Sequence, residues 1–485
     1  MLELHDTRTR QAEPVVRARR GQLRMYTCGP TVYRHAHVGN LRSYLLSDLI
    51  RRTAELRGLR VMVCQNITDV GHLADDADLD PDGEDKVLAQ ARAEGRTALE
   101  IARCYEEAFR ADLAALNIRP AEHSPRASES IPLMIDMIAS LIESGHAYPA
   151  AYGSVFFDAR SFPGYGELSG NRLDDLRPGH RLRAGIGVNK RFHADWALWK
   201  GADPERQMTW DTPWGTGFPG WHTECSAMSL HYLGDVIDVH TGGIDLRFPH
   251  HEDERAQSNT LTGHEVVRHW VHGEHLLFEG RKMAKSAGNV VLLADLAGRG
   301  LDPLALRLAF LEQRYRQQMN LTWATLAGAD RTLRRWREQV ATWACEPSAP
   351  MSRRHADAVV TAFDSDLDTP AAMRELRALE KDTGVAPGAK FETFAHLDRL
   401  LGLDVVRDVG KIMRNSAGTA RNAANTAGNT ERSLPEGAAA LLEARAAARR
   451  AADWAVADQL RDRLASIGVT VSDTPDGQAW RVRAT

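Results

Sequence analysis

The sequence predicts an α/β fold: a doubly wound, Rossmann-type parallel sheet split by an insertion, followed by an all-α helical bundle and a small C-terminal α+β tail. Three observations predict it. Residues 24–70 read as strand, helix and strand. The stretch from 120 to 205 has short apolar runs broken by Gly and Pro, and residues 300–405 keep a helical period throughout. The 485 residues are 43% hydrophobic and 26% charged, an ordinary globular composition with material for about three domains.

The opening β-α-β unit is the clearest part of this pattern. The segment RMYTCGPTVY (24–33) is rich in strand formers, and the segment after it has apolar residues at helical spacing from Leu41 to Ile50. Gly58 ends the helix, and LRVMVCQNITDV follows as a buried strand. A strand, a helix and a second strand in this order predict the start of a parallel sheet.

The rest of the chain follows in blocks. Amphipathic helices are expected over 96–116 and 128–145, GDVIDVHTGG and HWVHGEHLLF read as strands that return to the sheet, and the chain closes with two Ala-rich helices and a hairpin at Pro-Asp-Gly. We expect a catalytic domain in two halves, 1–119 and 206–280, with an insertion, 120–205, between them. After it we expect a loop region (281–320), a helical domain (321–408), a polar flexible linker (409–436) and a C-terminal extension (437–485).

Composition excludes several classes of protein. Sixty-one basic and 65 acidic residues give a net charge of −4, so no overall field attracts nucleic acid, although a local basic face remains compatible with RNA binding. No apolar run reaches the length of a membrane span, and the first thirty residues lack a secretory pattern, so we expect a cytoplasmic protein. Because the sequence shows no coiled coil, we expect a monomer. The five cysteines include no CxxC pair, so any metal site must be assembled from distant segments.

The run His37-Val38-Gly39-Asn40 lies where a strand gives way to a helix. Unpaired N–H groups and the positive end of the helix dipole make such a start a phosphate site. Gly39 allows a nucleotide to approach the backbone, and His35 and His37 can donate to phosphate oxygens. Alternatively, this is an ordinary helix start with a surface histidine.

The run Lys282-Met283-Ala284-Lys285-Ser286 carries two of only eight lysines in the chain. Two ammonium groups on a loop can close over a triphosphate and stabilise charge that develops in the transition state. The alternative is a solvated loop, which the scarcity of lysine makes less attractive.

Three segments contain residues that commonly bind metals. Cys28 lies on the first strand, Cys225 in GWHTEC, and His250 and Glu254 are four residues apart and share a helical face. Strand ends converge in a doubly wound sheet, and zinc takes Cys, His and carboxylate ligands. The alternative is that the cysteines are core thiols.

Taken together, MYTCGPTVY–HVGN, NITDVG, GWHTECSAM, FPHHEDERAQS and KMAKSAGN, in this order, resemble a class I aminoacyl-tRNA synthetase of the bacterial cysteinyl-tRNA synthetase family. The resemblance extends from residue 24 to Trp480. It implies nucleotide-binding and catalytic roles for His35, His37, Gly39, Asn40, Lys282 and Lys285. It implies an amino-acid pocket at Gly29, Thr68 and Trp221, and one zinc ion held by Cys28, Cys225, His250 and Glu254.

The resemblance further implies the reaction: L-cysteine and ATP, with Mg²⁺, form cysteinyl-adenylate and pyrophosphate, and the cysteinyl group passes to the 3′ end of tRNA(Cys). The segments 281–320, 321–408 and 437–485 then correspond to the KMSKS loop with a stem-contact region, an anticodon-binding domain and a tRNA-binding extension. Phosphate contacts are expected from arginines of these regions, and base stacking from Trp480. The arginines are Arg331, Arg334, Arg335, Arg337, Arg461 and Arg463.

The chain departs from the family pattern at Ala284, Phe218 and Thr241. Two other functions stay open at this point. One is a ligase that passes cysteine to a non-tRNA amine, although such ligases lack the long C-terminal region. The other is a catalytically weak tRNA-binding paralogue, which only Ala284 indicates.

Overall fold

The computed structural model describes residues 2–71, 85–176, 190–202, 206–283, 289–410, 435, 437–451, 453–474 and 477–482. The chain divides into two compact units, Met1–Arg407 and Asp408–Thr485. Among the described residues, no helix combines the length and apolar character needed to cross a membrane.

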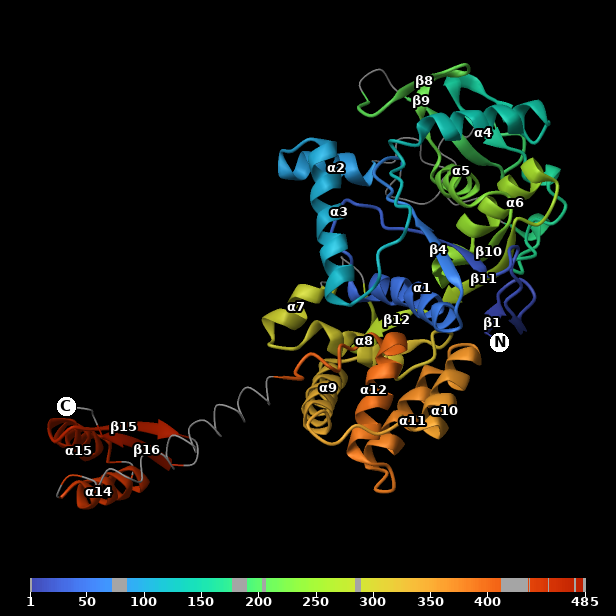
Figure 1. The fold of residues 1–485 in the computed structure, drawn as a ribbon. Coiled ribbons are helices and arrows are strands. Elements are labelled where there is room, and N and C mark those ends of the chain that lie inside the picture. Colours follow the sequence, from blue (N-terminus) through green and yellow to red (C-terminus); the bar gives the residue numbers. More distant parts are fainter. Residues whose placement is uncertain are drawn as a thin grey trace. The chain divides into compact units, whose positions relative to one another are not determined.

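A four-stranded parallel sheet forms the centre of the first unit (Figure 1). In spatial order its strands are β11 (Val267–Gly273), β10 (Ile237–Gly243), β3 (Gln22–Thr27) and β4 (Arg60–Gln65). The chain passes from β3 to β4 through α1 (Val38–Leu56), and from β10 to β11 in the opposite direction through α6 (His250–Thr262). Because such crossovers are right-handed, the two helices cover opposite faces, and the boundary between β3 and β10 is the switch point at which ligands bind. The doubly wound sheet that the sequence predicts is confirmed.

Helix α1 shows how local sequence positions this boundary. His37 and Asn40 form a reciprocal capping box at its start. Leu41, Leu45 and Leu49 lie on its buried side, as their spacing predicts. Two further helices lie between β4 and the insertion: α2 (Lys86–Glu94) and α3 (Ala98–Ala115).

The insertion contains α4 (Ile131–Glu143) and a five-stranded antiparallel sheet in the order β5-β6-β7-β9-β8. Met134 and Ile138 of α4 share a core with Phe157 and Trp196 of the sheet. We expected the parallel sheet to resume from residue 206, but β8 and β9 pair with each other across a tight turn and complete the antiparallel sheet. The strands are β5 (Ala147–Pro149), β6 (Val155–Phe157), β7 (Trp196–Gly201), β8 (Trp210–Thr212) and β9 (Gly215–Pro219). The chain then enters α5 (Trp221–Leu233), which leads to β10.

After the parallel sheet, the chain is mainly helical, as its periodicity predicts. Asp48 of α1 accepts from Arg307 of α8 (Pro303–Leu311) at 2.6 Å and from Arg52 at 2.7 Å, and this buried network joins the helical region to the helix that follows β3. The helices are α7 (Leu293–Gly298), α8 (Pro303–Leu311), α9 (Trp323–Trp343), α10 (Arg353–Asp364), α11 (Thr369–Lys381) and α12 (Pro387–Leu401). Small sheets are formed by β1 (Glu3–Asp6) with β2 (Gln11–Pro14), and by β12 (Leu276–Phe278) with β13 (Arg281–Lys282) and β14 (Met319–Leu321).

The described residues of the second unit form two helices and a hairpin, as the sequence predicts. Its core gathers Ala438, Leu442, Leu464 and Val469, and Trp480 packs against it, partly buried. The elements are α14 (Ala438–Arg450), α15 (Trp454–Ser466), β15 (Val469–Thr474) and β16 (Gly477–Val482). Most of the predicted linker, residues 411–434 and 436, lies outside the described residues.

Candidate active site and metal centre

The switch point between β3 and β10 is held together by hydrogen bonds at the strand ends. The Cys28 N–H donates to the Thr241 carbonyl at 3.3 Å, and the hydroxyls of Thr27 and Thr241 lie 2.9 Å apart. Thr241 is one of the three departures from the family pattern, and it serves here as a buried hydrogen-bond partner. These bonds fix Cys28 at the carboxyl edge of the sheet.

Cys28, Cys225, His250 and Glu254 converge at this edge from β3, α5 and α6. One potential ligand atom from each lies within 4.8 Å of the others, and no side chain of the four is more than 7% exposed. Their separations are 3.9 Å between the two sulfurs, 3.5 Å from Cys28 Sγ to Glu254 Oε1 and 3.0 Å from His250 Nε2 to Glu254 Oε1. The sequence-predicted set is therefore one cluster in space.

The chemistry of this cluster suits a tetrahedral zinc ion. Zinc bonds of about 2.0–2.3 Å place neighbouring ligand atoms about 3.3–3.8 Å apart, close to the separations above. Two sulfurs, one imidazole and one carboxylate are also a donor set that zinc prefers. Burial raises the pKa of Cys225, but hydrogen bonding with Cys28 and the charge of His250 bring it down to about 7, so its thiolate is accessible near neutral pH.

A second group of histidines surrounds Cys28, and sequence reasoning missed it. His251 Nε2 lies 3.2 Å and His240 Nε2 3.4 Å from Cys28 Sγ, and with Glu254 these residues form an alternative four-ligand set. Both sets use Cys28 and Glu254, so they describe one ion site rather than two. His272 Nε2 supports His251 Nδ1 at 2.8 Å. A sequence signal was available for two of these histidines, because HTGG and VHGEH place His240 and His272 near the carboxyl ends of β10 and β11, whereas His251 lies in helix α6.

The predicted pocket residues adjoin this cluster. Trp221 stacks on His250 with ring centroids 4.1 Å apart. Gly29 donates its N–H to Asn66 Oδ1 at 2.7 Å, and a Cβ at Gly29 would lie 1.6 Å from the Asn66 carbonyl oxygen, so only glycine fits. The Thr68 hydroxyl donates to Glu224 Oε2 at 2.7 Å. Burial, and then the neighbouring Cys225, raises the pKa of the Glu224 carboxyl well above its ordinary value.

The imidazole of His37, at the start of α1, is held in a neutral form that can donate a hydrogen bond. Its Nδ1 accepts from the Asn40 N–H at 3.2 Å, which leaves the proton of a neutral ring on Nε2. Burial, followed by the charge of Arg34, lowers the pKa of His37 to about 4. His35 is exposed and packs edge-on against Tyr105.

The described residues on both sides of the lysine loop contact the start of α1. Val38 N–H donates to the Val291 carbonyl at 2.9 Å, and a Cβ at Gly39 would lie 2.9 Å from Met283 Cε. The Asn289 amide donates to the Lys282 carbonyl at 3.0 Å. Residues 284–288, which include Ala284, Lys285 and Ser286, lie outside the described residues. Lys282 itself is exposed on β13.

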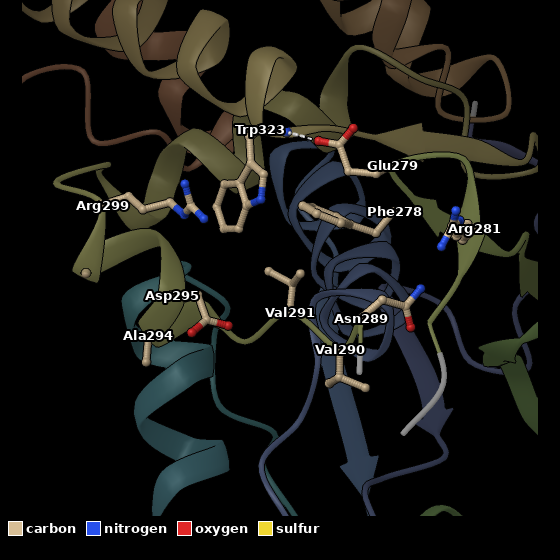
Figure 2. A pocket seen from close by; sticks show the side chains of 11 residues that line it. Phe278, Glu279, Arg281, Asn289, Val290, Val291, Ala294, Asp295, Arg299 and Trp323 are labelled. Atoms are coloured by element: carbon tan, nitrogen blue, oxygen red, sulfur yellow. Dashed lines mark hydrogen bonds between the residues drawn. The ribbon is translucent and has the colours of Figure 1, made fainter. Parts of the chain in front are cut away.

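The described flanks of the lysine loop also line a cavity of about 650 Å³. Figure 2 shows Trp323 and Phe278 along one side and Asp295 and Val291 along the other, with the Arg299 guanidinium 3.8 Å from the centroid of the Trp323 ring. The residues that line it belong to β12, β13, α7 and α9 and to the segment 289–291, and they share no member with the metal cluster.

Comparison with known proteins settles the family. Residues 14–331 match the family model of the class I (C) tRNA synthetase catalytic domain, and residues 431–481 match that of the cysteinyl-tRNA ligase anticodon binding domain. The cysteine–tRNA ligase of Thermus thermophilus is 41% identical, covering 99% of each chain. This chain belongs to the class I cysteinyl-tRNA synthetase family. A further cysteine–tRNA ligase, from Salinibacter ruber, is 40% identical over 99% of this chain and 98% of its own.

Solved structures of other class I synthetases support the fold of this family member. Mycobacterium tuberculosis methionyl-tRNA synthetase, 16% identical, covers 83% of this chain and 93% of its own with a TM-score of 0.53. The Agrobacterium radiobacter leucyl-tRNA synthetase, 11% identical, covers 80% of this chain and 84% of its own with a TM-score of 0.57. At this identity the likeness concerns the fold alone.

The arginines expected to contact tRNA differ in their surroundings. Arg337 is fully buried, paired with Asp302 at 2.6 Å and bonded to the Leu403 carbonyl, so its predicted phosphate contact is wrong. Its position on α9 carries a signal of burial, because Arg337 lies on the same helix face as the buried Leu333 and Val340. Arg334 and Arg335 are half-exposed and paired with Asp330 and Glu380. The third departure, Phe218, is buried beneath the Arg206 guanidinium at 3.6 Å.

Proposed function

We propose that this protein activates L-cysteine with ATP and transfers the cysteinyl group to the 3′ end of tRNA(Cys). The observation that carries the proposal is the convergence of the Cys28–Cys225–His250–Glu254 cluster with Thr68 and Trp221 at the sheet's switch point, next to the start of α1. A sulfur-binding cluster and a phosphate site on one sheet edge suit an amino acid with a thiol side chain that reacts with a nucleotide.

The four clustered residues would hold one Zn²⁺. Zinc coordinates a thiolate far more readily than a neutral hydroxyl, so it would distinguish cysteine from serine. A pocket that selects by fit alone separates such near-isosteres by only about 10–200-fold. Trp221, stacked on His250, would form one wall of this end of the pocket.

At the nucleotide end, the chain supplies positioning and charge rather than covalent chemistry. His37 Nε2–H and the first N–H groups of α1 would donate to phosphate oxygens of ATP, whose β- and γ-phosphates carry Mg²⁺. Asn40 keeps the His37 ring in place through the capping box. Lys282 and Lys285 would balance charge as pyrophosphate leaves.

The acceptor is argued from the second unit. Residues 431–481 match an anticodon binding domain, which a ligase with a small amine acceptor does not need. The alternative of a weak paralogue is likewise unsupported, because the predicted metal-binding side chains are all present and clustered. We therefore propose tRNA(Cys) as the acceptor.

Two assays with zinc-loaded full-length protein test this function. Cysteine-dependent ATP–pyrophosphate exchange measures activation, and charging of a tRNA(Cys) transcript measures transfer, with serine and an uncharged non-cognate tRNA as controls. We expect both reactions with cysteine and tRNA(Cys), and neither with serine. Exchange without charging would contradict the acceptor, and absence of both would contradict the activity.

A further inference from the structure

A directed chain of hydrogen bonds joins the predicted pocket residues. The Gly29 N–H donates to Asn66 Oδ1 at 2.7 Å, Asn66 Nδ2 donates to the Thr68 hydroxyl at 3.0 Å, and that hydroxyl donates to Glu224 Oε2 at 2.7 Å. With Glu224 ionised, each hydrogen bond in this chain has one direction, because the backbone N–H fixes the orientation of the Asn66 amide and a carboxylate can only accept. The chain links the ends of β3 and β4 to helix α5.

At the Thr68–Glu224 end of this chain, the open positions are acceptors. The only proton of Thr68 is used on Glu224, so its hydroxyl can offer only its remaining lone pair. Glu224 Oε1 has no hydrogen-bond partner among the described residues, and Glu224 is completely buried. A buried carboxylate oxygen without a partner is costly, so a donor is expected to complete it.

Asp69 shows what a structural carboxylate looks like in the same segment. It is 2% exposed, and its two oxygens accept from the Ser128 N–H at 2.8 Å and the Ser128 hydroxyl at 2.6 Å. Both oxygens of Asp69 thus have hydrogen-bond partners within the protein. Glu224, which directly precedes Cys225 of the metal cluster, has one oxygen without a partner among the described residues.

We infer that Glu224, held by Thr68, binds the α-ammonium group of the amino-acid substrate. An ammonium group has three donors, no acceptor and a positive charge, which matches the open lone pair of Thr68 and the unpartnered oxygen of the buried Glu224 carboxylate. Asn66 is a positioning residue that sets the direction of the Thr68 hydroxyl. This inference rests on the proposed function, because it assumes that the substrate is an amino acid whose side chain is held at the metal cluster.

The test compares cysteine with 3-mercaptopropionate, which has the thiol and the carboxylate but no amino group. Dissociation constants of both are measured by calorimetry on the zinc-loaded wild type, Glu224→Gln and the matched control Asp69→Asn. We expect Glu224→Gln to weaken cysteine binding about 10- to 100-fold, as for a lost charged hydrogen bond, and to leave 3-mercaptopropionate within about 2-fold. Asp69→Asn should leave the ratio of the two constants unchanged.

Equal weakening of both ligands by Glu224→Gln, or unchanged binding of cysteine, would overturn the inference while leaving the proposed function intact. Failure of the wild type to bind cysteine or to catalyse exchange would instead count against the proposed function. If Glu224→Gln does not fold, Thr68→Val and Thr68→Ser provide the second test. Thr68→Val should weaken cysteine selectively, and Thr68→Ser, which keeps the hydroxyl, should restore the wild-type ratio; equal behaviour of the two would overturn the inference.

Discussion

The amino-acid end and the nucleotide end of this site are built differently. At the amino-acid end, Cys225, Glu254 and Glu224 are at most 2% exposed and are held by neighbouring side chains. At the nucleotide end, Asn40 and Lys282 are exposed, and position comes from a helix cap and from backbone contacts at the loop flanks. The first region is thus preorganised by packing, whereas the second depends on local capping and backbone hydrogen bonds. Substitutions should therefore affect metal and amino-acid binding at one end and the rate of activation at the other.

The largest effect is expected at the buried end. Cys225→Ser should lower zinc affinity by more than about 100-fold, because a neutral hydroxyl replaces a thiolate ligand, and cysteine-dependent exchange should fall with it. Metal content after gel filtration and exchange activity measure the two effects. ATP binding should remain, since the nucleotide end does not depend on this cluster.

Cys64→Ser is the matched control, because Cys64 is also a buried cysteine at the end of a neighbouring strand but belongs to neither ligand set. It should retain zinc and exchange activity. Full exchange activity in a zinc-free Cys225→Ser protein would refute the role of the cluster.

A smaller effect is expected at the start of α1. His37→Ala should reduce the exchange rate by about 100-fold, the typical loss of one transition-state hydrogen-bond donor, with zinc content and the KM for cysteine unchanged. His37→Asn separates two contributions of this side chain, because asparagine caps a helix well but does not reach as far as imidazole Nε2. If His37→Asn restores the rate, the role of His37 is capping rather than donation.

The fold was largely predictable because its main signals are local. The helical spacing of Leu41 and Leu45 and the capping residues His37 and Asn40 act within one helix. The end of the insertion was not predictable, because β8 and β9 are three and five residues long and only the pairing of β9 with β7 shows which sheet they join. Short strands carry too few side chains to reveal the partner.

The candidate site divides in the same way. The Cys28, Cys225 and Glu254 set was predictable from residue type and from the rule that strand ends converge. Glu224 and His251 were not, because each stands directly beside a predicted ligand and only burial shows that it faces the cluster rather than solvent. Arg337 shows the opposite error, a role assigned to a residue that cannot have it. A charged helix residue is ordinarily exposed, but this one lies in the core.

The smallest effect is expected from a substitution beside the lysine loop, and it tests whether the two ends of the site are independent. Asn289→Ala removes the hydrogen bond that links residues 289 and 282 across the lysine loop, so the loop should lose orientation without losing a charge. One such hydrogen bond is worth about 1 kcal/mol, which predicts a reduction of about 5-fold in the exchange rate at saturating cysteine.

Asn320→Ala is the matched control, because Asn320 accepts from the Gly280 N–H at 2.7 Å in the same small sheet but away from the loop. Equal losses in the two variants would mean that the whole sheet, and not the closure of the loop, controls activation. A change in zinc content in Asn289→Ala would mean that the two ends of the site are not independent.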